Sequence, residues 1–315
     1  MSALVKSFVK KLPYPLLLRL HHYYDLRRKS TLAHAASKLT GLPLLQTLDL
    51  GATKTSNTVF VLGSGSSVNN IPESRWKAIS QHDSIGLNFW LAHSFVPRMY
   101  LFENTIQDWP AHKALLGLLQ ARAADYREVV KIISEIDSLS PGQLIFEIPS
   151  TLHAHLYVGY STRIAARTER EFISGIHYLR RQGIFNHENR IHWHLKNAGS
   201  VTAAISLATR MNYRRIVLCG VDLGKAEYFY HDPVLYPEAC RWAFTPKDQA
   251  QVMARRYPWG LPAADVIVHF KEQVLDPLGI KLFVENRGSM LFPRVPEVPQ
   301  QLFEELAQAI PSASS

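Results

Sequence analysis

Short apolar runs alternate with longer amphipathic stretches along most of the chain, starting near residue 56. The run at 58–62 is rich in β-branched side chains and ends in glycine, as is typical of a strand buried in a parallel sheet. We predict strands at 58–62, 84–88, 98–102, 144–148, 215–220 and 280–284. Apolar positions recur with helical spacing at 111–136, 162–181, 199–211 and 264–275. Strands that alternate with helices predict an α/β fold with a Rossmann-like, doubly wound and mostly parallel sheet. Ligands of such sheets bind beyond the carboxyl ends of the strands, so the functional residues are expected there.

The same pattern divides the chain into three parts. Residues 51–292 hold the predicted strands and form one Rossmann-like catalytic domain, whereas 1–50 are an N-terminal extension and 293–315 a C-terminal tail with a short helix. Within the main domain, residues 228–262 are rich in aromatic side chains and proline. We predict that this segment closes as a lid over the ligand; the alternative is that its aromatic side chains only cover the edge of the sheet.

The chain is basic, with 35 Lys and Arg residues against 26 Asp and Glu and a formal net charge of +9. Residues 1–30 carry seven of the basic residues and one acid, Asp25, which amounts to +6. Leucine and tyrosine side chains lie between these charges, a mixture typical of segments that bind anionic membranes. We therefore predict that residues 1–30 bind an anionic membrane surface. The alternative is a basic helix that packs on the main domain and turns its charges to water.

Composition also excludes several classes of protein. The two cysteines, Cys219 and Cys240, are too few for a disulfide framework or a Cys-rich zinc site, which favours a reducing compartment. No apolar run approaches the roughly 20 residues of a transmembrane helix, and the sequence has no RNP-like motif or helix-turn-helix signature that would indicate a nucleic-acid partner. We expect a cytoplasmic protein held peripherally at the inner face of the cell membrane, and a homo-oligomer stays open.

The first predicted strand runs directly into Gly63, Ser64, Gly65 and Ser66. Glycines let the backbone turn tightly and approach a ligand, while serine hydroxyls and backbone amides can donate hydrogen bonds to phosphate or ribose. The pattern lacks the third glycine of the dinucleotide fingerprint and the Lys of a P-loop, so a plain tight turn is the alternative. We predict that these four residues bind a nucleotide.

Asparagine stands at the ends of two successive predicted strands, Asn88 after the second and Asn104 after the third. Asparagine is disfavoured in strands, and its amide can serve a base or a sugar as donor and acceptor at once. Turn formation explains either residue equally well. Together they favour a binding site.

Two further motifs follow in the second half of the chain. Asn197, Gly199 and Ser200 open a predicted helix, where exposed backbone amides and the helix dipole attract an anion; an ordinary N-cap is the alternative. Asp222 follows 215–220, the clearest of the predicted buried strands. Its carboxylate can accept hydrogen bonds from sugar hydroxyls or a base amine, or it can merely cap the next turn.

The order of these five motifs resembles the bacterial sialyltransferases of glycosyltransferase family 42 and the related sialyltransferase-like domains of motility-associated glycosylation factors. The likeness covers about residues 57–290 and rests on the order and spacing of the motifs. It implies a GT-A-like variant of the Rossmann-like fold. It also implies a bacterial enzyme that transfers a nonulosonic acid, such as sialic acid or Kdo, from a CMP-linked donor to a glycan or lipid-linked glycan acceptor with inversion.

The resemblance also implies roles for individual residues. Contacts with the nucleotide sugar map onto the strand ends and the helix start, at Gly63, Gly65, Ser66, Asn88, Asn104, Gly199, Ser200 and Asp222. Of two tyrosines that bind the departing phosphate in that family, the later matches Tyr230, but the earlier position is Gly224. Tyr228 or Lys225 is therefore expected to share that role.

The general base of that family is a histidine in the loop before the last helix. His231 is the one histidine in this interval, and it comes much earlier in the loop than the family's residue. Imidazole titrates near neutrality, so we predict His231 as the base, with His192 and His194 in reserve.

Diphosphate-dependent glycosyltransferases hold a metal through an Asp-x-Asp motif, and none stands at a strand end in this sequence. We therefore predict no metal and no cofactor besides the CMP-sugar donor. Two alternatives stay open: a non-catalytic nucleotide-binding protein, and a pterin diphosphokinase-like enzyme of similar fold that would need Mg²⁺ and ATP.

Overall fold

The computed structural model describes residues 13–104, 109–136, 139, 144–224, 227–240 and 261–308. Predictions for residues 1–12, for Lys225, for lid residues 241–260 and for the tail from 309 lie outside these ranges.

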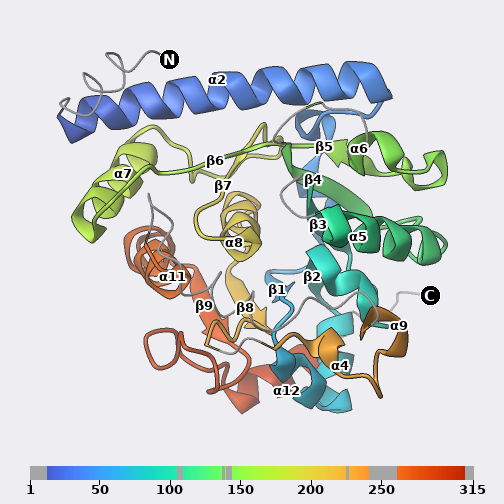
Figure 1. Ribbon diagram of the computed structural model, residues 1–315. Coiled ribbons are helices and arrows are strands. Elements are labelled where there is room, and N and C mark those ends of the chain that lie inside the picture. The colour runs from blue at the N-terminus through green and yellow to red at the C-terminus, as the bar shows by residue number, and fades with distance from the viewer. Residues whose placement is uncertain are drawn as a thin grey trace.

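Seven parallel strands form the central sheet in the order β5-β4-β3-β2-β1-β8-β9 (Figure 1). Their bounds are Thr58–Leu62 (β1), Asp83–Leu87 (β2), Met99–Asn104 (β3), Val130–Ile136 (β4), Leu156–Val158 (β5), Arg215–Cys219 (β8) and Lys281–Val284 (β9). A small second sheet pairs β6 (Ser161–Thr162) with β7 (His194–Leu195). The predicted α/β fold with a doubly wound, mostly parallel sheet is confirmed, and the predicted strands of β1, β2, β3, β8 and β9 lie where expected.

The strand order reverses between β1 and β8. From β1 the chain moves outward to β5, then returns through helix α8 (Ser200–Arg210) and places β8 on the other side of β1. Leu62 pairs with Gly86 of β2 on one side and with Cys219 of β8 on the other. The segments that follow these three strands therefore start at the same level. Doubly wound sheets bind their ligands at such a switch point.

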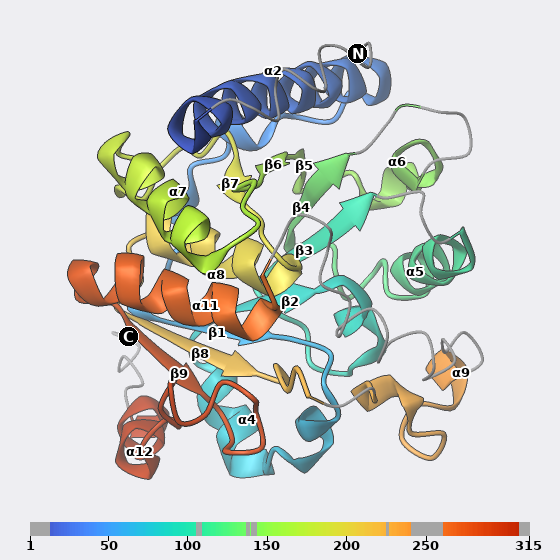
Figure 2. The same cartoon turned by 60° about the vertical axis from the view of Figure 1, so that its left-hand side comes forward.

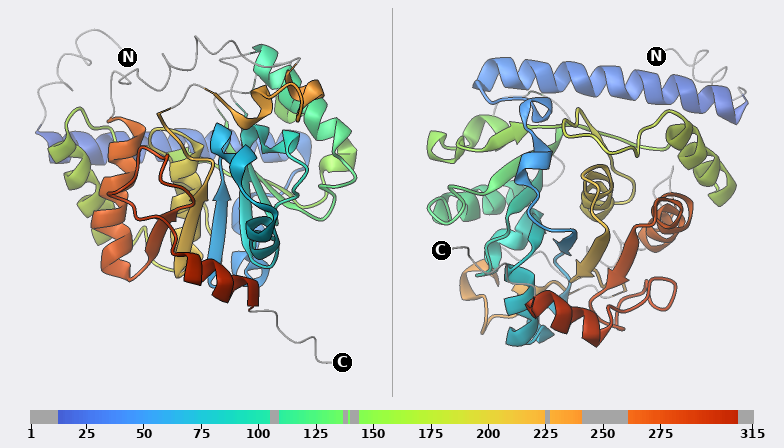
Figure 3. Two further views of the ribbon diagram at one scale, coloured as in Figure 1. Left: turned by 90° about the horizontal axis from the view of Figure 1, so that it is seen from below. Right: turned by 180° about the vertical axis from the view of Figure 1, so that it is seen from behind.

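Helices cover both faces of the sheet (Figures 2 and 3). One face carries α7 (Glu169–Arg181), α8 and α11 (Ala263–Phe270), and the other carries α4 (Glu73–Ser80), α5 (Trp109–Ala121) and α12 (Gln300–Gln308). Successive strand residues point to opposite faces: Val59 and Val61 pack on the α8 side, and Phe60 and Leu62 on the α4 side. All four are fully buried, so each face of the sheet has its own apolar core.

Helix α2 (Tyr14–Thr40) lies across one end of the molecule (Figures 1 and 3). It begins after Pro13 and ends at Gly41, whose φ of 74° terminates the helix. Its buried side chains are spaced by three, four or seven positions and form one face, at Leu18, His22, Lys29, Ala33 and Ala36. This part of the N-terminal extension is therefore a basic helix packed on the main body. No helix of the described residues is long and apolar enough to cross a membrane.

Two secondary-structure predictions are wrong, and a third is partly wrong, because the predicted helix 162–181 begins only at Glu169 and Thr162 lies in strand β6. The predicted helix 111–136 ends with α5 at Ala121, and its last part is strand β4. The predicted strand 144–148 is instead the short helix α6 (Leu144–Glu147), and the edge position is taken by β5. Both errors have one cause, because a strand buried on both faces loses its alternation and a short apolar run fits helix and strand alike.

Candidate functional site

The glycine-rich turn after β1 is packed against the segment that follows β8. The N–H of Gly63 donates to Cys219 O at 2.8 Å, and the N–H of Gly65 donates to Gly220 O at 2.7 Å. A Cβ on Gly63 would lie 2.6 Å from Gly220 O, and one on Gly65 would lie 2.5 Å from Asp222 Oδ2. The glycines are therefore required by the contact between two strand ends. Because these two amides are already engaged, they are not the free phosphate donors that the sequence led us to expect.

Asp222 holds the other end of the same turn. Its side chain, 4 % exposed, accepts hydrogen bonds from the N–H and the hydroxyl of Ser67 at 3.0 and 2.5 Å. These bonds fix the start of the 3₁₀ segment η2 (Ser66–Asn70). A carboxylate has about four acceptor sites, so this structural role leaves capacity for a ligand hydroxyl.

The segment that follows Glu227 covers the turn from the other side. The N–H of Phe229 donates to Ser64 O at 3.0 Å, and Tyr228 pairs with Gly65 in an isolated antiparallel bridge. Asn69 adds a side-chain bond from Nδ2 to Phe229 O at 3.1 Å. The described part of the predicted lid is thus in contact with the predicted nucleotide-binding turn.

Tyr230 brings this segment to the end of β2. Its ring, 3 % exposed, lies 5.5 Å from the ring of Phe89 and 5.1 Å from that of Tyr228, measured between centroids. Burial raises the pKa of Tyr230 well above its ordinary value, and Tyr228 adds to the rise. Tyr230 therefore stays a neutral phenol, which can donate a hydrogen bond.

His231 ends the short helix η5 (Phe229–His231). Its Nδ1 accepts a long hydrogen bond from the N–H of Tyr228 at 3.4 Å, and its buried Nε2 has no partner among the described residues. Burial lowers the pKa of His231, with Glu227 opposing part of the shift. A neutral imidazole whose Nδ1 accepts carries its proton on Nε2. In this arrangement Nε2 is a donor, and a role as base would require the other tautomer.

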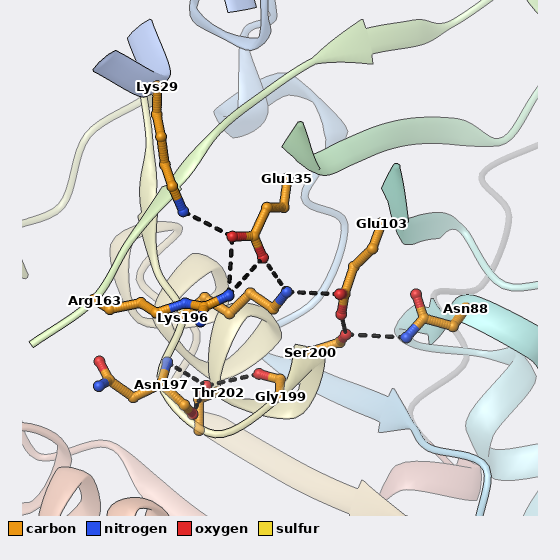
Figure 4. A network of polar contacts seen from close by, with 10 residues as sticks. All are labelled: Lys29, Asn88, Glu103, Glu135, Arg163, Lys196, Asn197, Gly199, Ser200 and Thr202. Carbon is orange, nitrogen blue, oxygen red and sulfur yellow. Dashed lines mark hydrogen bonds and ion pairs between the residues drawn. The ribbon is translucent and has the colours of Figure 1, made fainter. Parts of the chain in front are cut away.

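Asn88 and Ser200, far apart in the sequence, meet at the end of β2 (Figure 4). Asn88 has a φ of 45°, a left-handed conformation that asparagine tolerates better than most residues. Its Nδ2 donates to Ser200 Oγ at 3.0 Å, and Ser200 Oγ in turn donates to Glu103. The structure therefore joins two predicted site residues to the end of β3.

At the end of β3, the side chain of Glu103 contacts Ser200, whereas that of Asn104 points to the other face of the sheet. Asn104 is 1 % exposed and accepts from the N–H of Ile145 at 2.9 Å. Tyr100 and Phe102 point to the same side as Asn104, into the α5 core, whereas Leu101 packs on the α8 side. The two-residue period of a strand thus assigns Glu103 to the α8 side. A role for Asn104 in binding stays a prediction, and its visible role is to hold α6.

A β-bulge places a second carboxylate beside Glu103. The β3–β4 register pairs Phe102 with Ile133 but Glu103 with Glu135, so β4 carries one extra residue, Ser134. Bulges re-aim the side chains that follow them and are common next to functional sites. Glu135 is turned in this way to the side of Glu103.

Lys196 binds both carboxylates. Its Nζ lies 2.7 Å from Glu103 Oε2 and also contacts Glu135 Oε2. Glu135 receives two more cations, Lys29 of α2 at 2.7 Å and Arg163 at 3.0 Å. The side chains of Glu135 and Lys196 are 1 % and 5 % exposed. We call Lys29, Glu103, Glu135, Arg163 and Lys196 the charged cluster (Figure 4).

The charges of the cluster offset the cost of burying them. Burial alone would raise the pKa of Glu135, but the surrounding cations, Lys196 first, outweigh it and hold that pKa well below the ordinary range. Burial likewise opposes ionisation of Glu103, whose pKa Lys196 and Ser200 nevertheless lower. The pKa of Lys196 is raised, because both carboxylates outweigh the effect of burial. All three groups are therefore ionised at neutral pH.

The segment from Lys196 to α8 is built by local hydrogen bonds. The Asn197 amide pairs with the backbone of Ile164, accepting from its N–H and donating to its carbonyl, both at 3.0 Å. Thr202 Oγ1 accepts from the N–H of Asn197 at 3.0 Å. Gly199 has a φ of 115°, and no atom of the described residues lies within 4 Å of where its Cβ would be. Asn197 is therefore occupied structurally, while Gly199 leaves open space at the start of α8.

The two reserve histidines stand in different surroundings. His192 is exposed, whereas His194 is fully buried in β7 and neither ring nitrogen has a partner among the described residues. Burial, reinforced by Lys196, lowers the pKa of His194 to about 3. A buried, weakly basic imidazole cannot deprotonate an acceptor hydroxyl, so His194 does not suit the role of base.

In the part of the chain that the structure describes, no group of three or more His, Cys, Asp or Glu side chains could hold a metal ion. Metal independence of the reaction stays a prediction.

The residues that sequence reasoning missed are Glu103, Glu135 and Lys196. Glu103 could have been found from the strand period, since it continues the face of Leu101. Glu135 could not, because a one-residue bulge reverses its side. Lys196 directly precedes a predicted site residue, but nothing in the sequence pairs it with two distant carboxylates.

No family model matches the sequence, and no curated protein matches it. Among solved structures, the sialyltransferase CstII from Campylobacter jejuni, in complex with a substrate analogue, cytidine-5'-monophosphate, is similar at 14% identity with a TM-score of 0.39. The match covers 77% of this chain and 85% of that one. A likeness this distant concerns the fold alone and says nothing about activity.

Proposed function

We propose that the protein is an inverting glycosyltransferase that moves a nonulosonic acid, such as sialic acid or Kdo, from CMP to a glycan or lipid-linked glycan acceptor. One observation carries the proposal: Asn88 after β2 donates to Ser200 at the start of α8, and the motifs after β1 and β8 pack together at the switch point of the sheet. That is where a doubly wound sheet binds a nucleotide.

The donor would bind with its nucleotide across β1 and β8. The hydroxyls of Ser64 and Ser66 supply donors on the glycine-rich turn, and Asp222 supplies an acceptor for ribose or base. Asn88 lies at the next strand end and presents an amide beside Ser200. The open space at Gly199 gives room at the start of α8, where the helix dipole favours a phosphate.

Departure of CMP needs hydrogen-bond donors on its phosphate. Tyr230 is a neutral phenol, and His231 has a buried Nε2 without a partner among the described residues; both belong to the segment that covers the turn. Preorganised donors of this kind stabilise the charge that develops on a leaving group. Position 224 is a glycine, and a Cβ there would lie 2.7 Å from Cγ of the exposed Met290, whose side chain would have to move to admit a tyrosine. Tyr230 and His231 would therefore share the task.

The charged cluster would act as a support for this site. Lys196 fixes Glu103, Glu103 accepts from Ser200, and Ser200 accepts from Asn88. A side chain with fixed partners loses little entropy when a ligand binds. The cluster carries three cations and two carboxylates, and its surplus positive charge favours an anionic donor.

A second candidate is a nucleotide-binding protein without catalysis. It is favoured by the tautomer of His231, whose Nε2 is a donor, and by the burial of His194, because these leave no established base among the described residues.

Nucleotide binding and chemistry are tested separately on the full chain. Calorimetry with CMP, UMP, GMP and AMP should show a preference for CMP, and CMP release from a CMP-linked nonulosonate should show turnover. Binding of CMP without turnover on any acceptor would support the second candidate. Equal affinity for the four nucleotides would contradict both the proposal of a CMP-linked donor and the proposed nucleotide-binding site.

Single variants then assign the roles. Tyr230→Phe and His231→Ala should each lower kcat of CMP release by about 10²-fold or more with little change in CMP affinity. His192→Ala is the matched control at an exposed histidine. If only His192→Ala lowers kcat, the assignment of His231 is wrong.

A further inference from the structure

The outward face of α2 carries an unusual set of side chains. Opposite its buried face lie four large apolar or aromatic residues, Leu16, Leu20, Tyr23 and Tyr24, which are 45, 49, 63 and 72% exposed. Their spacing of three, four or eight positions puts them on one side of the helix. Two aromatic rings and two leucines exposed side by side are uncommon on a surface that faces only water.

The same face is positively charged and has no carboxylate. Arg27 and Arg28 are exposed between the apolar side chains, whereas Arg19 lies over the ring of Tyr178 of α7, 5.8 Å from its centroid. Asp25 is the one acid of the helix, and it turns toward the main body, where it accepts from Thr162 Oγ1 at 3.0 Å. Lys29 also points inward, to Glu135. The structure therefore separates the charges of α2 more clearly than the sequence does: Asp25, Lys29 and Arg19 contact the main body, and Arg27 and Arg28 are on the outward side.

We infer that this face of α2 docks on the surface of an anionic lipid bilayer. Arginines at the level of the headgroups, with leucine and tyrosine side chains reaching the acyl boundary, are the pattern of interfacial helices. The positive face lacks any carboxylate that would have to be desolvated, which complements a negative surface. The inference concerns described residues 14–40 and does not depend on the proposed glycosyltransfer.

Helix α2 is already folded and packed on the main body before it meets a membrane. Leu18, Ala33 and Ala36 are buried against the main body, and Lys29 anchors the helix through its ion pair with Glu135. Interfacial helices that are disordered in water lose affinity because they must fold on binding. A helix already packed on one side avoids that cost, and it fixes the main body at a defined orientation to the membrane.

The test measures partition of the full chain into phosphatidylglycerol–phosphatidylcholine vesicles and into phosphatidylcholine vesicles alone. Arg27→Gln/Arg28→Gln should lower partition into the anionic vesicles by about 25-fold, since each basic residue near the surface contributes about fivefold. The matched control is Lys281→Gln/Arg287→Gln, which removes two exposed cations in and after β9, the edge strand far from α2. It should leave partition into the anionic vesicles unchanged.

The apolar contribution is tested in the same way. Leu20→Ser should lower partition by about tenfold, and Leu278→Ser, at another exposed leucine, should not. Unchanged thermal unfolding of all variants shows that the fold is intact. The inference is overturned if the chain does not prefer anionic vesicles, or if the controls lose as much as the α2 variants. It is also overturned if Leu20→Ser dissociates a dimer in sedimentation velocity while vesicle binding is unchanged, because the face would then bind a second copy of the chain.

Discussion

The candidate site is built from two regions that are held together in different ways. The glycine-rich turn is fixed by main-chain contacts with the end of β8 and by the Asp222 cap on Ser67. The charged cluster is fixed by side chains alone, drawn from α2, β3, β4 and the residues directly after β6 and β7. The first region depends on close backbone contact, because a Cβ added at Gly63 or Gly65 would overlap atoms of the segment after β8. The second depends on charge balance and tolerates no missing partner, so substitutions should affect the two regions through different mechanisms.

The largest effect is expected for Lys196→Met. The variant keeps most of the side-chain volume but leaves Glu103 without its cation and Glu135 with two cations instead of three. Breaking a buried pair by removing one partner costs about 3–5 kcal/mol. Urea unfolding measures this loss, and Lys38→Met, at an exposed position of α2, should change it little. A loss below about 1 kcal/mol would mean that the cluster behaves as a surface ion pair.

Gly220→Ala should have the next largest effect and acts on shape. Gly220 has a φ of 64°, and an added Cβ would overlap Val68 Cγ2 and lie 2.7 Å from Gly63 O. Left-handed backbone costs about 1–2 kcal/mol and overpacking about 1–3 kcal/mol, so we expect a loss of about 2–5 kcal/mol in urea unfolding.

Gly199→Ala is the matched control for Gly220→Ala. Its φ is also positive, at 115°, but its Cβ would have no neighbour within 4 Å in the part of the chain that the structure describes. Only the conformational cost of about 1–3 kcal/mol applies. If Gly199→Ala is as destabilising as Gly220→Ala, contact between the strand ends does not explain the glycine at 220.

The difference between the two regions also explains which parts of the site could be predicted from the sequence. The shape-dependent region has a signature, since Gly63, Gly65 and Asp222 stand directly after apolar strands, and those strands are confirmed in the central sheet. The charged cluster has none, because its partners lie 61 and 106 positions apart in the chain. The bulge at Ser134 also prevents prediction of the cluster from the sequence. It turns Glu135 to the opposite face of the sheet, and no feature of the sequence marks its position.

The pH dependence of stability should separate a buried histidine from an exposed one. The pKa of His194 is lowered in the folded state from 6.5 to about 3. A lowered pKa gives stability that is fully present above pH 6.5 and is lost as the pH falls toward 3, because unfolding then binds a proton. The slope for one such group is about 1.4 kcal/mol per pH unit.

His194→Phe should remove that slope from the unfolding free energy between pH 6.5 and 5, and His192→Phe should not. Other buried histidines, such as His93, whose pKa burial lowers to about 4, keep a slope in both variants, so the difference between variants is the informative quantity. Glu103 and Glu135 do not interfere, because their lowered pKa values shift their own effect to pH below 4.5. Equal slopes in the two variants would show that His194 is not buried as a neutral imidazole.

The smallest effect on stability is expected for Asp222→Asn, which sharpens the comparison between the two regions. The change keeps the shape of the side chain and one acceptor oxygen, but it weakens the two charge-assisted bonds from Ser67. Hydrogen bonds to charged groups contribute about 1.5–3 kcal/mol each, and an amide retains part of this, so we expect a loss of about 1–2 kcal/mol in urea unfolding. Because Asp222 has no cation partner among the described residues, its removal leaves no charge unpaired, unlike that of Lys196. Ser67→Ala removes one of the same bonds from the other side, and the two effects should not add if the bond explains both. A loss for Asp222→Asn as large as that for Lys196→Met would show that the turn also depends on charge.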